Sequence, residues 1–227
     1  LDGVLNSDNV SVDLTGLTGT LSGSDAETYT SVTLPRLTLT GGAASNYTLP
    51  QSMGAVPASV TISKATLTAT GATVASKTYD GNTAASVSSV TFTGLVPGEA
   101  LALGTDYTAT GTFADANAGT GKSVSIAVTL KDSAKANNYN LTNGSVNATG
   151  TIAKASSSIT TAPSATGITY GQALSDSALT DGEAVSGDTT LTGAWNWTAP
   201  ATKPNAGTAQ YEVTFTPSDT NYDTATV

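Results

Sequence analysis

The sequence contains no cysteine and no histidine, and only 11% of its 227 residues are charged. The absence of these two residue types excludes thiol catalysis, cysteine-bound zinc, histidine general bases and Ser-His-Asp triads. The acidic residues that remain are scattered through turn-like segments, without an obvious facing pair of the kind that a retaining glycosidase uses. We therefore expect no enzymatic activity and no cofactor.

Positive charge is also scarce. The chain has 8 lysines and arginines against 17 aspartates and glutamates, which gives a net charge of −9. Nucleic acids and anionic membrane surfaces are bound through lysine and arginine, so we expect neither as a partner. Apolar runs stay well short of the ~20 residues that cross a bilayer, so we expect no membrane insertion. The sequence begins at Leu1 without a visible signal peptide, and we interpret it as part of a longer polypeptide.

Helical patterns are missing as well, whereas small and β-branched residues are abundant. Residues 123–130 read SVSIAVTL, and this period of two is typical of a half-buried strand. Turn residues recur at short intervals along the chain. Short strands separated by such turns predict an all-β fold of antiparallel β-sandwich modules that resemble immunoglobulin domains.

The stretch KTYDGN at residues 77–82 lies between two strand-like segments, residues 67–74 and 87–92. Asp80-Gly81 predicts a tight hairpin between these strands, because glycine takes the positive φ that such a turn needs.

The sequence repeats itself. Asn46-Tyr47 recurs 92 positions later as Asn138-Tyr139, and Tyr170 follows Tyr79 by 91 positions. These offsets predict tandem repeats.

Three repeats are expected. Repeat 1 (residues 1–64) lacks its first strands, repeat 2 (residues 65–154) is complete, and repeat 3 (residues 155–227) lacks a closing strand. The linkers at residues 64–65 and 154–155 have no Gly/Ser run of the kind that makes a flexible tether. We therefore expect the modules to lie end to end with limited bending, and the chain to be a monomer whose partners are neighbouring repeats of its own polypeptide.

The core of repeat 2 is predicted from its apolar positions. The predicted core residues are Leu67, Ala69, Val74, Val87, Val90, Phe92, Leu95, Tyr107, Phe113, Val124, Ile126, Val128, Leu130, Tyr139, Leu141, Val146 and Ile152.

Repeat 2 resembles the YDG type of repeat in large bacterial surface proteins. The motifs that carry this resemblance are KTYDGN at residues 77–82, FADANAG at 113–119, Lys122, NYNL at 138–141 and TGTIAKA at 149–155. Repeat 1 keeps only the later motifs, and its counterpart of FADANAG is not recognisable.

Repeat 3 is similar to the MBG or bacterial Ig-like type of repeat. The residues that match are Trp197, Pro200, AGT at 206–208, FTP at 215–217 and NY at 221–222. Together the two resemblances imply β-sandwich modules in the stalk of an adhesin, outside the cell at the bacterial surface. The expected function is an extended spacer that projects a binding domain and bears tension. The alternative is a module that itself binds a glycan or a host protein.

Two tryptophans in repeat 3 are the candidate ligand contacts. Trp195 and Trp197 are two residues apart, so on a strand they share a face. They would form an aromatic platform for a sugar ring, or else belong to the core, which is the interpretation we favour because sandwiches commonly bury a tryptophan.

The recurring tyrosines are expected to be buried rings whose hydroxyl reaches a loop partner. They are Tyr47, Tyr79, Tyr139, Tyr170 and Tyr222.

Oxygen-bearing side chains in the loops allow a calcium site, because calcium takes 6–8 oxygen ligands. The candidates are Asp106, Asp115, Asn117 and Asp132. No EF-hand or RTX spacing is present, and turn chemistry explains the same residues. A lysine–asparagine isopeptide bond is a further alternative for Lys77, Lys122 or Lys154, and it needs a buried lysine, an asparagine and a carboxylate in contact.

Overall fold

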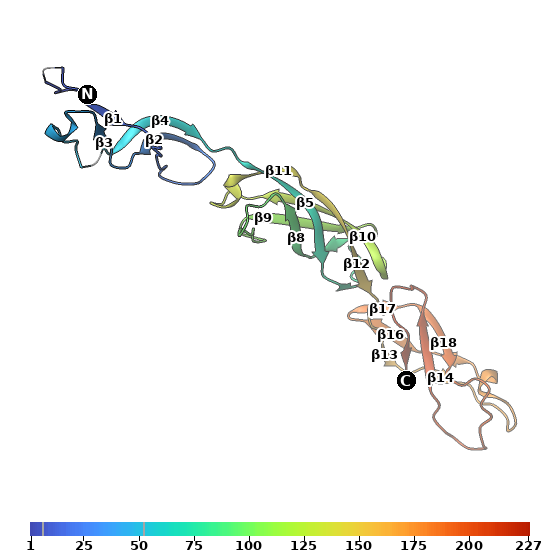
Figure 1. Ribbon diagram of the computed structural model, residues 1–227. Helices are drawn as coiled ribbons and strands as arrows, with labels where there is room; N and C mark the ends of the chain where they lie inside the picture. The colour runs from blue at the N-terminus through green and yellow to red at the C-terminus, as the bar shows by residue number, and fades with distance from the viewer. Residues whose placement is uncertain (6, 52) are drawn as a thin grey trace. The chain divides into compact units, whose positions relative to one another are not determined.

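The computed structural model describes residues 1–5, 7–51 and 53–227 (Figure 1). Over these residues the regular secondary structure consists of β-strands and short 3-10 helices, so the all-β prediction is confirmed. No helix of the described residues is long and apolar enough to cross a membrane.

The chain divides into two units. The first unit comprises residues 1–68, 93–108 and 130–143, and the second comprises residues 69–92, 109–129 and 144–227.

The first unit is built from short antiparallel pairs and one parallel pair. Its antiparallel pairs are β1 (Ser11–Asp13) with β3 (Thr38–Thr40), and β2 (Thr28–Thr33) with β4 (Ala55–Thr61). Two 3-10 helices, η1 (Ala44–Asn46) and η2 (Ala136–Asn138), each lead into the tyrosine of an Asn-Tyr pair. The strand β11 (Tyr139–Asn143) runs parallel to the start of β5 (Ala65–Val74).

The second unit contains the larger sheets. Here β5 pairs with β8 (Val87–Thr93). The five-stranded sheet has the order β6 (Lys77–Thr78), β12 (Ser145–Ala153), β10 (Gly119–Leu130), β9 (Tyr107–Phe113) and β7 (Ala84–Ala85). Its edge strands β6 and β7 are joined by the turn at residues 79–83, and the Nζ atom of Lys77 donates to the carbonyl of Ala84 across 3.3 Å. The sheet is therefore curled so that its two edges approach each other, nearly as in a barrel, which protects both edges.

Residues 155–227 form smaller sheets in the same unit. One sheet has the order β13 (Ser158–Thr161), β16 (Glu183–Ser186) and β17 (Thr189–Leu191), and another has the order β18 (Gly193–Trp197), β19 (Val213–Pro217) and β20 (Ala225–Thr226). The remaining elements are the pair β14 (Ser164–Ala165) and β15 (Leu179–Thr180), and the 3-10 helix η3 (Leu174–Asp176).

The predicted alternation in β10 is observed, because Val124, Ile126 and Val128 are buried whereas the residues between them are exposed. The other predicted core residues that are buried are Leu67, Ala69, Tyr107, Phe113, Tyr139, Val146 and Ile152. The predicted core residues that are only half-buried are Val74, Val87, Val90, Phe92, Leu95, Leu130 and Leu141.

The two strands predicted on either side of Asp80-Gly81 do pair with each other, as β5 and β8, but the turn does not connect them directly. Gly81 does have a positive φ, of 76°. However, the turn joins β6 and β7, which lie on opposite edges of the five-stranded sheet, rather than β5 and β8. The stretch between β5 and β8 is long enough to cross from one sheet to the other and back. The sheets also differ from a purely antiparallel arrangement in two places, because β11 runs parallel to β5 and β6 runs parallel to β12.

Candidate functional site

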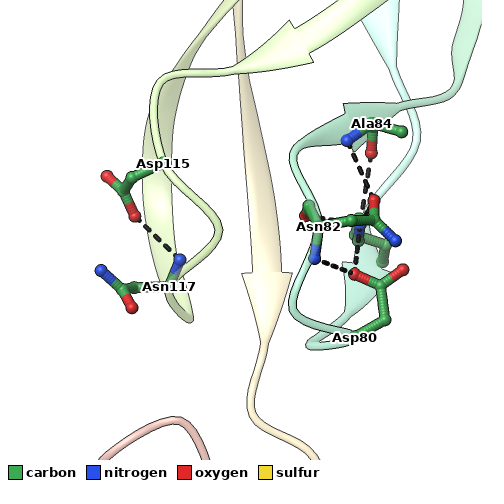
Figure 2. Close-up of polar contacts among 6 residues, drawn as sticks. Asp80, Asn82, Ala84, Asp115 and Asn117 are labelled. Atoms are coloured by element: carbon green, nitrogen blue, oxygen red, sulfur yellow. Dashed lines mark hydrogen bonds and ion pairs between the residues drawn. The ribbon is translucent and has the colours of Figure 1, made fainter.

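The turn after β6 is held by a chain of side-chain hydrogen bonds (Figure 2). An oxygen of Asp80 accepts the backbone N–H of Asn82 at 3.1 Å, and the side-chain oxygen of Asn82 accepts the N–H of Ala84 at 3.0 Å. Lys77 forms a 2.6 Å ion pair with Asp80 and donates to the side-chain oxygen of Asn82 at 2.9 Å. The lysine, and then the Asn82 amide, lower the pKa of Asp80.

A second turn, between β9 and β10, uses the same parts. Asp115 accepts the N–H of Asn117 at 2.8 Å, as Figure 2 shows, and pairs with Lys122 at 2.6 Å. The lysine is again the main cause that lowers the pKa of the aspartate. Both lysine side chains are largely covered, with exposed fractions of 18% for Lys77 and 13% for Lys122. These aspartates thus stabilise turns by accepting backbone and lysine hydrogen bonds.

The turn at Asn117 also contacts repeat 3. The side-chain oxygen of Asn221 accepts the N–H of Ala118 at 2.8 Å, and its amide nitrogen donates to the side-chain oxygen of Asn117 at 3.2 Å. Asn221 is only 8% exposed. Next to it, Tyr222 lies edge-on to the ring of Tyr79, with 5.5 Å between the centroids. A buried asparagine whose amide group is satisfied by the preceding repeat fixes the local geometry there.

The first unit contains the same arrangement between repeats 1 and 2. The side-chain oxygen of Asn138 accepts the N–H of Ala26 at 2.6 Å, and its amide nitrogen donates to the carboxylate of Asp25 at 2.8 Å. We call this pair of hydrogen bonds the junction contact. It joins the asparagine of an Asn-Tyr pair to an Asx-Ala pair of the preceding repeat.

Backbone pairing accompanies each junction contact. Tyr139 pairs in parallel with Ala65, and Tyr222 forms a parallel bridge with Ala155. Ala65 and Ala155 each follow directly after a predicted linker lysine. The first residue of repeat 2 and the first residue of repeat 3 therefore each pair, through the backbone, with the tyrosine of an Asn-Tyr pair.

The junction contact reveals a correspondence that sequence reasoning missed. Asp25-Ala26 precedes Asn117-Ala118 by 92 positions, the same offset as between the Asn-Tyr pairs of repeats 1 and 2. Residues 25–26 are therefore the counterpart of the FADANAG motif that was not recognisable in repeat 1. Only the alanine and the hydrogen-bonding side chain before it are retained, which is too little to find by sequence alone.

A second repeated contact involves the tyrosine hydroxyls. Tyr139 donates to the carboxylate of Glu99 at 2.6 Å and accepts the N–H of Val96 at 3.0 Å. Burial, and then the bond to Glu99, raise the pKa of Tyr139. In repeat 1, Tyr47 donates to Asp8 at 2.9 Å and accepts the N–H of Leu5 at 3.0 Å.

The recurring tyrosines, which were predicted to be buried, differ in how far they are exposed. Tyr139 is buried, and Tyr47, Tyr79 and Tyr222 are half-buried. The prediction is wrong for Tyr170, whose side chain is 77% exposed. The reason is local, because Tyr79 packs against the ring of Tyr222 and the described residues supply no such ring for Tyr170.

Both tryptophans of β18 face the core. Trp195 lies opposite Phe215 and Trp197 lies opposite Val213 on the neighbouring strand, and both of these partners are buried. The rings of Trp195 and Phe215 have centroids 4.9 Å apart. The indole N–H of Trp197 donates to the carbonyl of Ser177 at 3.0 Å. This placement fits the core interpretation better than an exposed platform, although each indole is only half-buried.

The calcium candidates lie in two separate units. Asp106 is 5% exposed, and its carboxylate accepts the N–H of Ala102 and the hydroxyl of Ser133, each at 2.8 Å. These two bonds are the main causes that lower the pKa of Asp106. Asp132 accepts the side-chain amide of Asn137 at 2.7 Å. Within the described residues no three acidic side chains form a group that could hold a metal ion. Calcium binding stays a prediction.

The isopeptide alternative can be compared with the geometry at Lys77. The lysine contacts both Asn82 and Asp80, so the three required groups are together. The carboxylate is not in a buried site, because the side chain of Asp80 is 48% exposed. The reaction requires burial, and the arrangement fits a hydrogen-bonded turn.

The architecture defined by these features is an all-β chain in which the asparagines of two Asn-Tyr pairs, Asn138 and Asn221, each make the same kind of polar contact with an earlier segment. The YDG domain family matches residues 1–54 and 63–149, and the chain belongs to this family. No curated protein and no solved structure matches the chain.

Proposed function

We propose that the chain is a non-catalytic spacer in a bacterial cell-surface adhesin. It would project a binding domain of the same polypeptide away from the cell and bear tension. In this proposal the protein is secreted and extracellular, and the three repeats are tandem Ig-like β-sandwich modules placed end to end. Repeat 3 belongs to the MBG or bacterial Ig-like type.

The observation that carries the proposal is the junction contact. Asn138 of repeat 2 contacts repeat 1, and Asn221 of repeat 3 contacts repeat 2. In both cases the asparagine accepts an alanine N–H and donates to a side-chain oxygen, which belongs to Asp25 in the first contact and to Asn117 in the second. A spacer needs junctions that resist bending, and a repeated side-chain contact at the linker provides this resistance locally. In repeat 2, the turns that are bonded to Lys77 and Lys122, and the approach of the two edges of the five-stranded sheet, give further resistance to unfolding.

The lack of cysteine and histidine in the sequence agrees with such a role. Carboxylates that would be candidates for catalysis or metal binding accept hydrogen bonds in turns, as at Asp80, Asp106 and Asp115. Many acidic and few basic side chains favour solubility.

The alternative function is direct binding of a glycan or a host protein by repeat 3 through Trp195 and Trp197. The half-exposed indoles are the observation that favours it.

A binding screen of the full chain separates the two functions. The spacer proposal predicts no binding on panels of cell-surface glycans and host proteins. Binding that falls at least tenfold in both Trp195→Phe and Trp197→Phe, with an unchanged circular dichroism spectrum, would replace the spacer with the binding module. Phenylalanine keeps a ring in the core, so that loss of folding does not imitate loss of a ligand.

A further inference from the structure

Six Asn-X-Ser/Thr sequons occur in the chain, and this tripeptide is the acceptor motif for N-linked sugars. Their asparagines all lie at exposed positions, and they are Asn9, Asn46, Asn140, Asn143, Asn147 and Asn196. The tripeptide recurs by chance in a sequence that is rich in serine and threonine. The structural environment of each asparagine therefore has to separate acceptors from chance matches.

The asparagines whose side chains form hydrogen bonds in turns, loops and junction contacts lie outside these sequons. They are Asn82, Asn117, Asn137, Asn138 and Asn221. The amide nitrogens of Asn138 and Asn221 are hydrogen-bond donors at the junctions. A sugar on either nitrogen would replace one of its hydrogens and would occupy the space of the contact. Sequons are thus missing at the asparagines where a sugar would disturb the folded chain.

Three sequons coincide with strands, at residues 140–142 in β11, 147–149 in β12 and 196–198 at the end of β18. Residues two apart on a strand share a face, so the asparagine and the hydroxyl residue of each sequon point to the same side. In all three, both of these residues are exposed and the residue between them is half-buried. Within the described part of the chain, the side chains of Asn140, Asn147 and Asn196 form no hydrogen bond.

The sequon in β12 is the most open of the three. Asn147 and Thr149 lie opposite Ser125 and Ser123 of β10, which are small and exposed. Asn147, Thr149 and Ser123 line a wide hollow of about 570 Å³, so a sugar on Asn147 would displace no side chain. The hydroxyl of Thr149 has no hydrogen-bond partner among the described residues.

The hydroxyls of the other two strand sequons are already used. Thr142 donates to the carbonyl of Leu67 at 3.1 Å, and the hydroxyl of Thr198 lies 2.9 Å from that of Thr214. Asn147 is therefore the sequon asparagine whose surroundings fit a sugar best.

We propose that Asn147 is the acceptor of an N-linked sugar, and that Asn140 and Asn196 are acceptors of the same kind. The side-chain nitrogen of the asparagine forms a bond to the anomeric carbon of a sugar that is carried on a diphosphate. The bond from that carbon to the diphosphate oxygen breaks, and its electron pair leaves with the diphosphate. The proton that the amide loses passes to the leaving diphosphate. The sugar donor is thus a glycosyl diphosphate, and the catalyst is a glycosyltransferase of the cell.

The transfer precedes folding. The backbone of β12 is paired with β10 in the folded chain, so this segment cannot enter the groove of a transferase as an extended peptide. Folding then keeps the sugar on the exposed face of the sheet. The proposal does not depend on the spacer function, because it concerns only the side-chain amides of exposed asparagines.

Peptide mapping of the full chain, isolated from the cells that naturally make it, tests the proposal. Trypsin cleaves after Lys135 and Lys154, so residues 136–154 form one peptide. This peptide contains the sequon asparagines at 140, 143 and 147 and also Asn137 and Asn138, which serve as internal controls. Mass spectrometry with electron-transfer fragmentation, which leaves sugars attached, locates the modified residues. We expect sugar at positions 140 and 147 and none at positions 137 and 138.

The mass of the added group identifies the carrier of the sugar. A single hexose at each site would indicate a nucleoside diphosphate, and one shared oligosaccharide would indicate a lipid diphosphate. Either result supports the proposal.

Two variants made in the same cells show whether the sequon itself is read. Thr149→Ala removes its hydroxyl and should abolish the sugar at Asn147, whereas the sugar at Asn140 on the same peptide should remain. Thr149→Ser keeps a hydroxyl and should keep the sugar at Asn147. The proposal is overturned if Asn147 of the parent chain carries no sugar, if Asn137 and Asn138 carry as much sugar as Asn147, or if the Thr149→Ala chain is still modified at Asn147.

Discussion

At the scale of single residues, the recurring side chains act mainly as hydrogen-bond partners of backbone amides. The hydroxyls of Tyr139 and Tyr47 each accept a loop N–H and donate to a carboxylate. The side-chain oxygens of Asn138 and Asn221 each accept an alanine N–H of the preceding repeat. An N–H that loses its partner costs more than the bond itself contributed, because the group stays desolvated. These residues therefore give sharp tests of the structure.

The first test concerns the tyrosine hydroxyls. Tyr139→Phe removes the acceptor for Val96 and the donor to Glu99, and we expect it to lower the free energy of unfolding by about 1–2 kcal/mol. Tyr47→Phe makes the same deletion at a half-buried position that water reaches, so its effect should be smaller. Urea unfolding, followed by NMR signals within each repeat, measures both. Equal effects would contradict the difference in burial.

The second test concerns the junction contact. Asn221→Ala leaves the N–H of Ala118 without its acceptor, and we expect hydrogen exchange at Ala118 to speed up by about tenfold, equivalent to about 1.4 kcal/mol. The matched control is Asn205→Ala. It removes an exposed asparagine from residues 205–208, which read NAGT as residues 117–120 do. Protection at Ala118 that survives Asn221→Ala would show that the contact does not form in solution.

At the scale of elements, three loops of the fold depend on ionised aspartates. The pKa of Asp106 lies below its ordinary value of 3.8, because it accepts hydrogen bonds from Ala102 and Ser133. The pKa values of Asp80 and Asp115 are lowered mainly by their lysines. In each case the unfolded chain binds the proton more tightly than the folded chain does.

Stability should consequently fall in acid. The contribution of these aspartates is fully present above pH 3.8 and is lost as the pH falls through their lowered values. The urea midpoint should therefore be nearly constant from pH 7 to about 5 and drop below pH about 4. Asp106→Asn keeps an acceptor oxygen but cannot titrate, so its midpoint should drop less than that of the parent chain. An equal drop of the urea midpoint in both chains would show that Asp106 does not contribute to the loss of stability in acid.

Sequence patterns predicted the strands better than their partners. The period of two in β10 located its buried face, and the glycine at 81 has the predicted backbone conformation. The strands β6 and β7 pair with β12 and β9, which lie far from them in the sequence. The residues of a local turn do not predict such long-range partners. Likewise, Gly94 is required because a Cβ there would meet the carbonyl oxygen of Thr66, a clash that only the folded chain reveals.

At the scale of the whole molecule, the repeat offsets predicted which residues are equivalent but not what they contact. The recurrence of Asn-Tyr pairs was visible in the sequence, whereas the Asx-Ala pairs that they hold share too few letters to be recognised. Burial of Tyr170 was predicted from its equivalence to Tyr79. The prediction failed because the ring of Tyr79 packs against Tyr222, whereas Tyr170 has no such ring beside it among the described residues.

Small-angle X-ray scattering on residues 1–227, extrapolated to zero concentration, tests the spacer proposal most directly. Extrapolation removes the effect of interactions between molecules. Three end-to-end modules of roughly 35–40 Å, from strands of about ten residues, predict a radius of gyration of about 30 Å. A compact globule of this length would give about 17 Å. A value near 30 Å is the result that we expect, and a value near 17 Å would contradict the spacer function.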